Sequence, residues 1–202
     1  MDIKVCLLVL IVLIKFGESH DHGRDNRVVG GFESRPHQFP FLVALVLTAD
    51  KGSQSFCGGS IIGPNHILTA AHCIEKIQKI DVMAGVHNVF MDKPLYHAEV
   101  FERDFLIHYA YNSDTLENDI ALIYLQTPIP LSSKLFVKVK KNKLDLLKKL
   151  ISDLMNPVTL PTRNQAMNQF TGTVITIAGW GRYSDCKYKQ INQIKNIVTC
   201  YV

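Results

Sequence analysis

Residues 56–73 read FCGGSIIGPNHILTAAHC, and this stretch decides how the rest of the chain is interpreted. Its short runs of isoleucine and leucine are separated by Gly, Pro and Asn, as is typical of β-strands joined by turns. The stretch ends on His72, which stands between a pair of alanines and Cys73. A lone histidine beside apolar residues is more often an ordinary side chain than a functional one. Its role therefore depends on what the rest of the chain contains.

Similar apolar runs recur along the chain and predict an all-β protein. They are short, rich in Val, Ile, Leu and Phe, and bounded by Gly, Pro, Asn or Asp. Their spacing is typical of a barrel or a sandwich. The runs are residues 39–47, 60–71, 79–85, 118–125 and 171–181. Only residues 141–155 carry a helical stripe of leucines and isoleucine at spacings of three and four.

The composition is that of an ordinary globular protein, with 202 residues, of which 47% are hydrophobic and 20% charged. The formal net charge is +4. Six lysines against two aspartates between Val137 and Asn156 account for all of it, so the remainder is neutral. Because no basic surface is left elsewhere, we expect no nucleic-acid partner.

The N-terminus predicts secretion. A short charged start precedes a ten-residue apolar run at 5–14, and small residues follow at 17–19, as in a signal peptide over residues 1–19 cleaved after Ser19. The alternatives are a membrane anchor or a buried helix, but a membrane-spanning helix needs about 20 apolar residues. No later segment is long and apolar enough either, so no stable membrane span is expected.

Removal of the signal peptide takes Cys6 with it and leaves four cysteines: Cys57, Cys73, Cys186 and Cys200. An even number of cysteines in a secreted chain favours disulfides over metal ligands or redox chemistry. The sequence contains neither a CxxC pair nor an HExxH motif. We therefore expect no metal site.

Four motifs, taken in order, resemble the chymotrypsin/trypsin family of secreted serine endopeptidases. The resemblance covers roughly residues 27–185. It implies two antiparallel β-barrels with the active site between them, of which this chain supplies the first barrel, residues 28–136, and an incomplete second barrel that starts at 157–185. The motifs are RVVGG (27–31), FCGGSIIGPNHILTAAHC (56–73), NDIALIYL (118–125) and AGWGR (178–182).

The resemblance assigns chemistry to His72 and Asp119. It implies that His72 is the general base and that Asp119 is the buried carboxylate that orients its imidazole. The alternative for Asp119 is an ordinary turn residue leading a strand. The family pattern also implies a bridge between Cys57 and Cys73, worth about 3 kcal/mol for a loop of this size; the alternative is two unpaired buried thiols.

Arg27 and Val28 resemble the family's activation junction. Cleavage between them by a trypsin-like protease releases the leader of residues 20–27 and creates an α-amine at Val28. In the family that amine pairs with an aspartate beside the nucleophilic serine. The alternative is an ordinary solvated arginine in a polar leader.

The sequence departs from the family at the nucleophile. The family's serine lies in a GDSGG segment, and residues 1–202 contain no such segment and no serine with glycine on both sides or aspartate before it. The oxyanion-hole backbone and the specificity pocket are missing with it. The chain as written is therefore predicted to be inactive. The family's chemistry uses only side chains and backbone amides, so no cofactor is expected.

Two stretches look foreign to the family, the lysine-rich residues 137–156 and the tail at 186–202. Both are interpreted as translated non-coding sequence. The alternative for 137–156 is a basic amphipathic helix that binds anionic membranes or docks a partner. An incomplete second barrel predicts unpaired strand edges and exposed apolar surface around Trp180, with a tendency to aggregate.

Two functions are compatible with these observations. The first is a secreted serine endopeptidase zymogen that hydrolyses protein or peptide substrates, of which this sequence is an imperfect gene model or an aberrant transcript. The second is a non-catalytic secreted homologue that acts as a binding or regulatory module. The first requires a serine-bearing segment in the native protein, whereas the second requires this chain to be soluble and stable as it stands.

Overall fold

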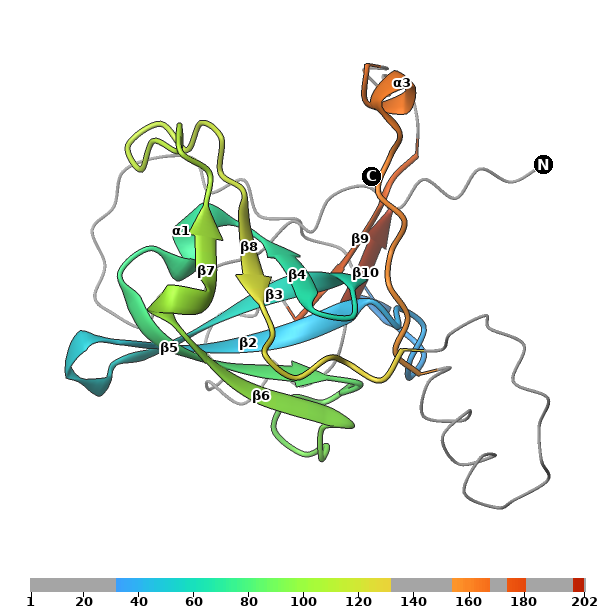
Figure 1. Cartoon of the computed structure of the whole chain (residues 1–202). Coiled ribbons are helices and arrows are strands. Elements are labelled where there is room, and N and C mark those ends of the chain that lie inside the picture. The colour runs from blue at the N-terminus through green and yellow to red at the C-terminus, as the bar shows by residue number, and fades with distance from the viewer. Residues whose placement is uncertain (1–31, 132–153, 168–173, 181–197, 202) are drawn as a thin grey trace, which may run out of the picture.

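Most of the regular structure that can be described belongs to two antiparallel sheets. The computed structural model describes residues 32–131, 154–167, 174–180 and 198–201 (Figure 1). Within these ranges a seven-stranded sheet curls around a core, and a three-stranded sheet stands beside it. The all-β prediction is confirmed.

The seven-stranded sheet has the strand order β6-β5-β2-β3-β4-β8-β7. Its neighbours all pair antiparallel. Hairpin-like neighbours such as β2 and β3 are joined by short connections, which suits a chain punctuated by Gly, Pro and Asn. The strands are β2 (Leu42–Ala49), β3 (Gln54–Gly63), β4 (His66–Thr69), β5 (Ile77–Ala84), β6 (Tyr96–Phe101), β7 (Phe105–Ile107) and β8 (Ala121–Tyr124).

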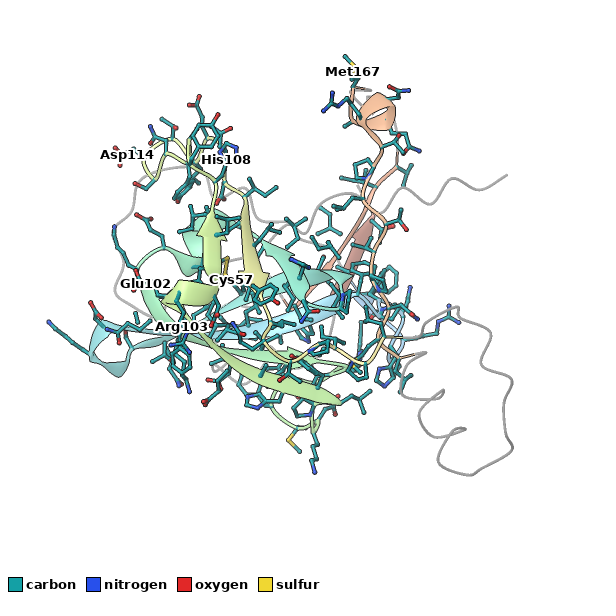
Figure 2. The ribbon with its side chains drawn as sticks, viewed as in Figure 1. Cys57, Glu102, Arg103, His108, Asp114 and Met167 are labelled. Carbon is teal, nitrogen blue, oxygen red and sulfur yellow. A yellow bond between two sulfur atoms is a disulfide. The ribbon has the colours of Figure 1, made fainter. Side chains whose placement is uncertain are left out.

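The second sheet has the order β1-β10-β9 and consists of β1 (Phe32–Glu33), β10 (Val198–Tyr201) and β9 (Thr176–Gly179). The helices in the described residues are single turns: η1 (Asp50–Gly52), α1 (Ala71–Ile74), η2 (Glu102–Asp104) and α3 (Arg163–Ala166). Met167, at the end of α3, is 80% exposed and lies away from the seven-stranded sheet (Figure 2).

Most predicted strands lie where the apolar runs placed them. The run at 60–71 divides into the end of β3, the whole of β4 and the start of α1, because Pro64 and Asn65 form the turn between the strands. Strand β6 was not among the predicted runs, since His97 and Glu99 interrupt its apolar residues. The helical stripe at 141–155 falls outside the described residues except for Leu154 and Met155, which lie in a turn and a bend.

Strand β2 is buried on both faces. Val43, Leu45 and Leu47 point into the core that the curled sheet encloses. Leu42 and Ala44, which alternate with them, belong to a second cluster on the other face. Side chains alternate along a strand, so two-sided burial requires a cover on each side of the sheet. This explains the nearly continuous apolar sequence of β2.

Trp180 lies at the centre of the second cluster. It is 4% exposed, its ring meets that of Phe56 edge-on with centroids 5.9 Å apart, and its Nε1–H donates to the carbonyl of His87 at 3.0 Å. Trp180 itself is therefore buried, contrary to the expectation, whereas Val174, in the same apolar run, is 73% exposed as expected. The outer face of the first sheet supplies the cover.

No helix within the described residues is long and apolar enough to cross a bilayer.

Gly59 is required by the close approach of β2 and β4 on either side of β3. A Cβ there would lie 2.7 Å from Cγ2 of Ile67 and 3.0 Å from Cγ2 of Val43, whereas a Cβ on Gly58 would meet nothing closer than 3.9 Å. We expect Gly59→Ala to lower the free energy of unfolding by about 1–3 kcal/mol through overpacking. Urea unfolding followed by Trp180 fluorescence measures this. A loss of similar size in Gly58→Ala would contradict the steric explanation.

Asp92 closes the loop between β5 and β6. Its Oδ2 accepts the backbone N–H groups of Asn88 at 2.7 Å and His87 at 2.8 Å. The bond from Asn88, assisted by that from His87, lowers the pKa of Asp92, while partial desolvation acts in the opposite direction. Because the folded pKa is depressed, the stabilisation is present above the ordinary pKa of an unfolded aspartate and is lost as the pH falls through the lower folded value.

We therefore expect Asp92→Ala to destabilise the protein at pH 7 by roughly 0.5–1 kcal/mol, a modest figure because solvent screens this site. The difference from the wild type should shrink as the pH falls below about 4. Urea midpoints measured between pH 7 and pH 3 test this. Asp114→Ala, which removes the same charge from another exposed loop, is the control. A pH-independent difference would show that the carboxylate's charge is irrelevant.

Candidate functional site

His72 lies in α1, the single helical turn that follows β4. Its neighbours Ala71, Cys73 and Ile74 are 1% exposed or less and anchor the turn in the core. Successive side chains of a helical turn point in different directions, so the residue between these anchors faces outward. The side chain of His72 is accordingly 17% exposed.

Asp119 meets His72 through both carboxylate oxygens. Oδ2 lies 2.5 Å from Nδ1 of the imidazole, and Oδ1 accepts the backbone N–H of His72 at 2.8 Å. An ionised carboxylate only accepts hydrogen bonds, so Nδ1 carries the proton and Nε2 of the neutral ring is an acceptor. The arrangement sets both the tautomer and the plane of the ring. The two residues that the family pattern singles out are thus brought together.

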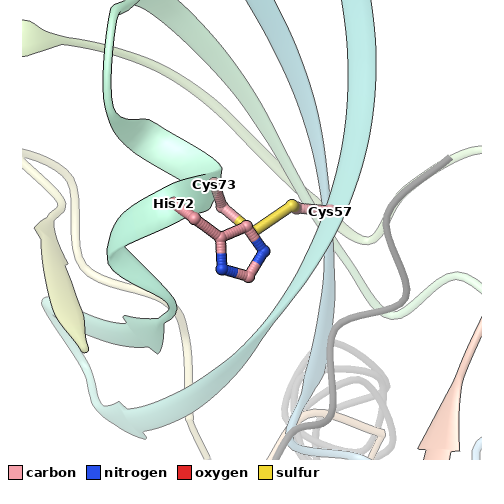
Figure 3. Close-up of side chains that lie close together, drawn as sticks. All are labelled: Cys57, His72 and Cys73. Carbon is pink, nitrogen blue, oxygen red and sulfur yellow. A yellow bond between two sulfur atoms is a disulfide. The ribbon is translucent and has the colours of Figure 1, made fainter. Parts of the chain in front are cut away.

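The predicted bridge between Cys57 and Cys73 is present, with both residues 1% exposed. It joins β3 to α1, so the turn that carries His72 is tied to the neighbouring strand. Figure 3 shows the imidazole beside the disulfide, and Nε2 lies 3.4 Å from Sγ of Cys73. The bridge therefore restrains the backbone on one side of the histidine while Asp119 restrains the ring on the other.

Donor atoms of Cys57, His72 and Cys73 all lie within 4.8 Å of one another, a spacing that a metal ion can bridge. Cysteine binds metals as a thiolate. Both sulfurs are already bonded to each other, so this cluster offers a metal only the imidazole nitrogen while the disulfide is intact.

Tyr111 borders the site and was missed by the sequence interpretation. Its ring packs against the core cluster to which Ala71 and Cys73 belong. Desolvation raises the pKa of Tyr111, and the negative charges of Glu75 and Asp119 act in the same direction. All three effects favour the neutral phenol over the phenolate. No motif in the sequence distinguishes this tyrosine from the other aromatic residues.

Asn118 is a second residue that the sequence analysis left unused, although it stands beside Asp119 in the quoted run at 118–125. Its backbone has φ +55°, in the left-handed region, and its side-chain amide donates to the carbonyl of Ala110 at 2.9 Å. A backbone angle of this kind cannot be read from the apolar pattern. Arg27 and Val28, the predicted activation junction, lie outside the described residues.

Comparison with known proteins agrees with the geometry. The sequence profile of the trypsin family matches residues 28–200. Brachyurin of Leptuca pugilator is 34% identical over 158 residues, which cover 78% of this chain and 57% of brachyurin. Cathepsin G of Homo sapiens is 32% identical over 178 residues, covering 88% of this chain and 58% of that protein.

A solved structure of HL collagenase superposes with a TM-score of 0.62 and 25% identity, covering 86% of this chain and 62% of that one. The chain thus spans less than two thirds of the length of these relatives. The profile match extends over most of the sequence, and the curled sheet agrees with the fold of the solved structure. The chain belongs to the trypsin family of chymotrypsin-like serine proteases.

Proposed function

We propose that this chain comes from a secreted serine endopeptidase made as a zymogen, with His72 as its general base and Asp119 as the carboxylate that orients it. The observation that supports this most strongly is the pair of hydrogen bonds between the two residues, to Nδ1 and to the backbone N–H of His72. A carboxylate so placed stabilises the imidazolium that forms when the base accepts a proton.

In this proposal Nε2 of His72 takes the proton of a serine hydroxyl as that oxygen attacks the peptide carbonyl. The same nitrogen then returns the proton to the leaving amine, which leaves an acyl-enzyme for water to hydrolyse. Asp119 stays ionised throughout and holds the proton on Nδ1. Protein or peptide chains are the proposed substrates, and no cofactor enters these steps.

We propose further that the polypeptide of this sequence is inactive by itself. None of its serines stands in a GDSGG segment. A base without its nucleophile and oxyanion donors has nothing to activate.

The segment boundaries belong to the same proposal. Residues 1–19 are a signal peptide that directs secretion, 20–27 are a leader removed by a trypsin-like protease between Arg27 and Val28, and 28–136 form the first barrel. The sequence predicts that an insert follows at 137–156. We place its end before Met155, because that side chain is fully buried in the first core and the N–H of Asn156 donates to the carbonyl of Pro40 at 3.1 Å.

The second barrel begins at 157–185 in this proposal, and 186–202 are a tail of foreign origin. The N–H of Val158 donates to the carbonyl of Ile61 at 2.8 Å, so the chain after the insert rejoins the first sheet. The β10 residues 198–201, which pair with β9 and β1, fall inside this tail. Because β10 pairs with both neighbouring strands, this pairing argues against a foreign origin for residues 198–201.

A second function, a non-catalytic secreted homologue that binds or regulates, is favoured by one observation. The second apolar cluster is covered within the described residues, and Trp180 is 4% exposed. Because this ring is buried, the chain exposes less apolar surface than the sequence predicts and is less prone to aggregate.

The inactive state has a direct test. We expect the chain, cleaved after Arg27, to remain unlabelled by a fluorophosphonate probe, because such probes need an activated serine. Intact-mass spectrometry measures the labelling. Trypsin treated in the same way is the positive control. Covalent modification of any serine in residues 28–202 would contradict the proposed inactivity.

Sequencing the mature messenger RNA across the codons for 136–157 and beyond Asp185 distinguishes the two proposed functions. We expect the lysine-rich segment to be spliced out and the frame to continue to a GDSGG segment. In the protein encoded by that message, His72→Ala should lower kcat/KM by at least about 100-fold, the contribution typical of a general base. His97→Ala, which removes an exposed histidine from β6, should leave it unchanged.

A message that matches the present sequence to Val202 would instead support the binding module. Equal values of kcat/KM in His72→Ala and His97→Ala would show that His72 is not the general base.

A further inference from the structure

The loop between β7 and β8, residues 108–120, carries Asp119 and is closed by three transverse hydrogen bonds. Figure 2 places His108 and Asp114 on this loop, beyond the ends of β7 and β8. The bonds join the two sides of the loop at successive positions, and we call each of them a rung. They run from His108 N to Ile120 O at 3.1 Å, from Asn118 Nδ2 to Ala110 O at 2.9 Å and from Asn112 N to Glu117 O at 3.0 Å.

The middle rung is the one made by a side chain. Residues 112 to 118 are all exposed, so burial in the core does not hold this part of the loop. Its shape therefore depends on hydrogen bonds and on backbone preference. The amide of Asn118 is the only side-chain donor among the three rungs, and it lies next to the carboxylate-bearing residue.

Asn118 also controls the backbone at Asp119. It has φ +55°, a region that asparagine tolerates better than most residues with a side chain. Its carbonyl accepts the N–H of Ile120 at 2.7 Å, which makes Asp119 the central residue of a three-residue turn. A turn this tight leaves the direction of the Asp119 side chain little freedom.

We propose that Asn118 is a positioning residue for the catalytic pair. Its left-handed backbone and its amide bond to Ala110 hold the Asp119 carboxylate where Oδ1 and Oδ2 reach the backbone N–H and Nδ1 of His72 together. The catalytic meaning of this role rests on the proposed function. The effect of Asn118 on the stability of the hydrogen bond between His72 and Asp119 can be measured without catalytic turnover.

Two substitutions separate the contributions of Asn118. Asn118→Ala removes the amide and disfavours the left-handed backbone, whereas Asn118→Gly removes the amide but keeps that backbone accessible. The readout is the exchange with water of the His72 Nδ1 proton, followed by ¹H–¹⁵N NMR on the whole chain. We expect exchange about tenfold faster in Asn118→Ala and a smaller acceleration in Asn118→Gly, because local opening of the bond becomes more frequent.

Asp119→Asn identifies the resonance, because it must lose this signal or shift it strongly. Asn88→Ala is the matched control: it removes an asparagine side chain that accepts backbone N–H groups in the loop between β5 and β6, and it should leave the exchange unchanged. The backbone amides of β8 report whether a variant has loosened the whole sheet.

Wild-type exchange in both Asn118 variants would overturn the proposal. So would equal acceleration of the β8 amides, since that would indicate general destabilisation, and so would a wild-type spectrum without a proton that responds to Asp119→Asn. Failure of the proposed endopeptidase function has a different signature, because it would appear in the message or in kcat/KM while this exchange rate remained sensitive to Asn118.

Discussion

The antiparallel pairing of β4 with β8 is the constraint on which the candidate site depends. Thr69 lies opposite Ala121, so α1 leaves the end of β4 beside the point where the loop of 108–120 enters β8. His72 and Asp119, 47 residues apart in the sequence, become neighbours for this reason. A slip of one residue would turn every side chain of β8 to the opposite face and move the carboxylate away from the ring.

Three further features restrain the backbone and the ring of His72. The disulfide between Cys57 and Cys73 ties the turn to β3, and Ala71 and Ile74 bury its inner side. Asp119 then binds both the backbone and the ring of His72. The backbone is restrained from the core side and the ring from the loop side, so the acceptor nitrogen keeps one direction. Preorganisation of this kind is what general-base catalysis requires.

The two-sided burial of β2 links the site to the rest of the molecule. One face of β2 contributes to the core beneath β4 and β8, and the other contacts the cluster that contains Trp180. The indole reaches the carbonyl of His87, a residue 93 positions earlier in the chain. The residue after strand β9 is therefore held by packing against the first sheet and by a hydrogen bond to the loop between β5 and β6, which explains why Trp180 is buried.

The sequence by itself determined the all-β class, the position of most strands and, through the family motifs, the pairing of His72 with Asp119 and of Cys57 with Cys73. These features depend on local alternation, on turn residues and on short motifs, all of which are visible in neighbouring letters. Strand β6 was not predicted because His97 and Glu99 interrupt its apolar pattern, although its backbone pairs fully with β5.

Only the tertiary structure decided which carboxylate oxygen meets which nitrogen, what covers Trp180, and that Asn118 adopts a left-handed backbone beside Asp119. Each of these depends on strand register or on packing between segments far apart in the chain. A pattern of neighbouring residues reports the period of a strand, but it does not report its partner, because pairing is chosen by the burial that the whole sheet achieves.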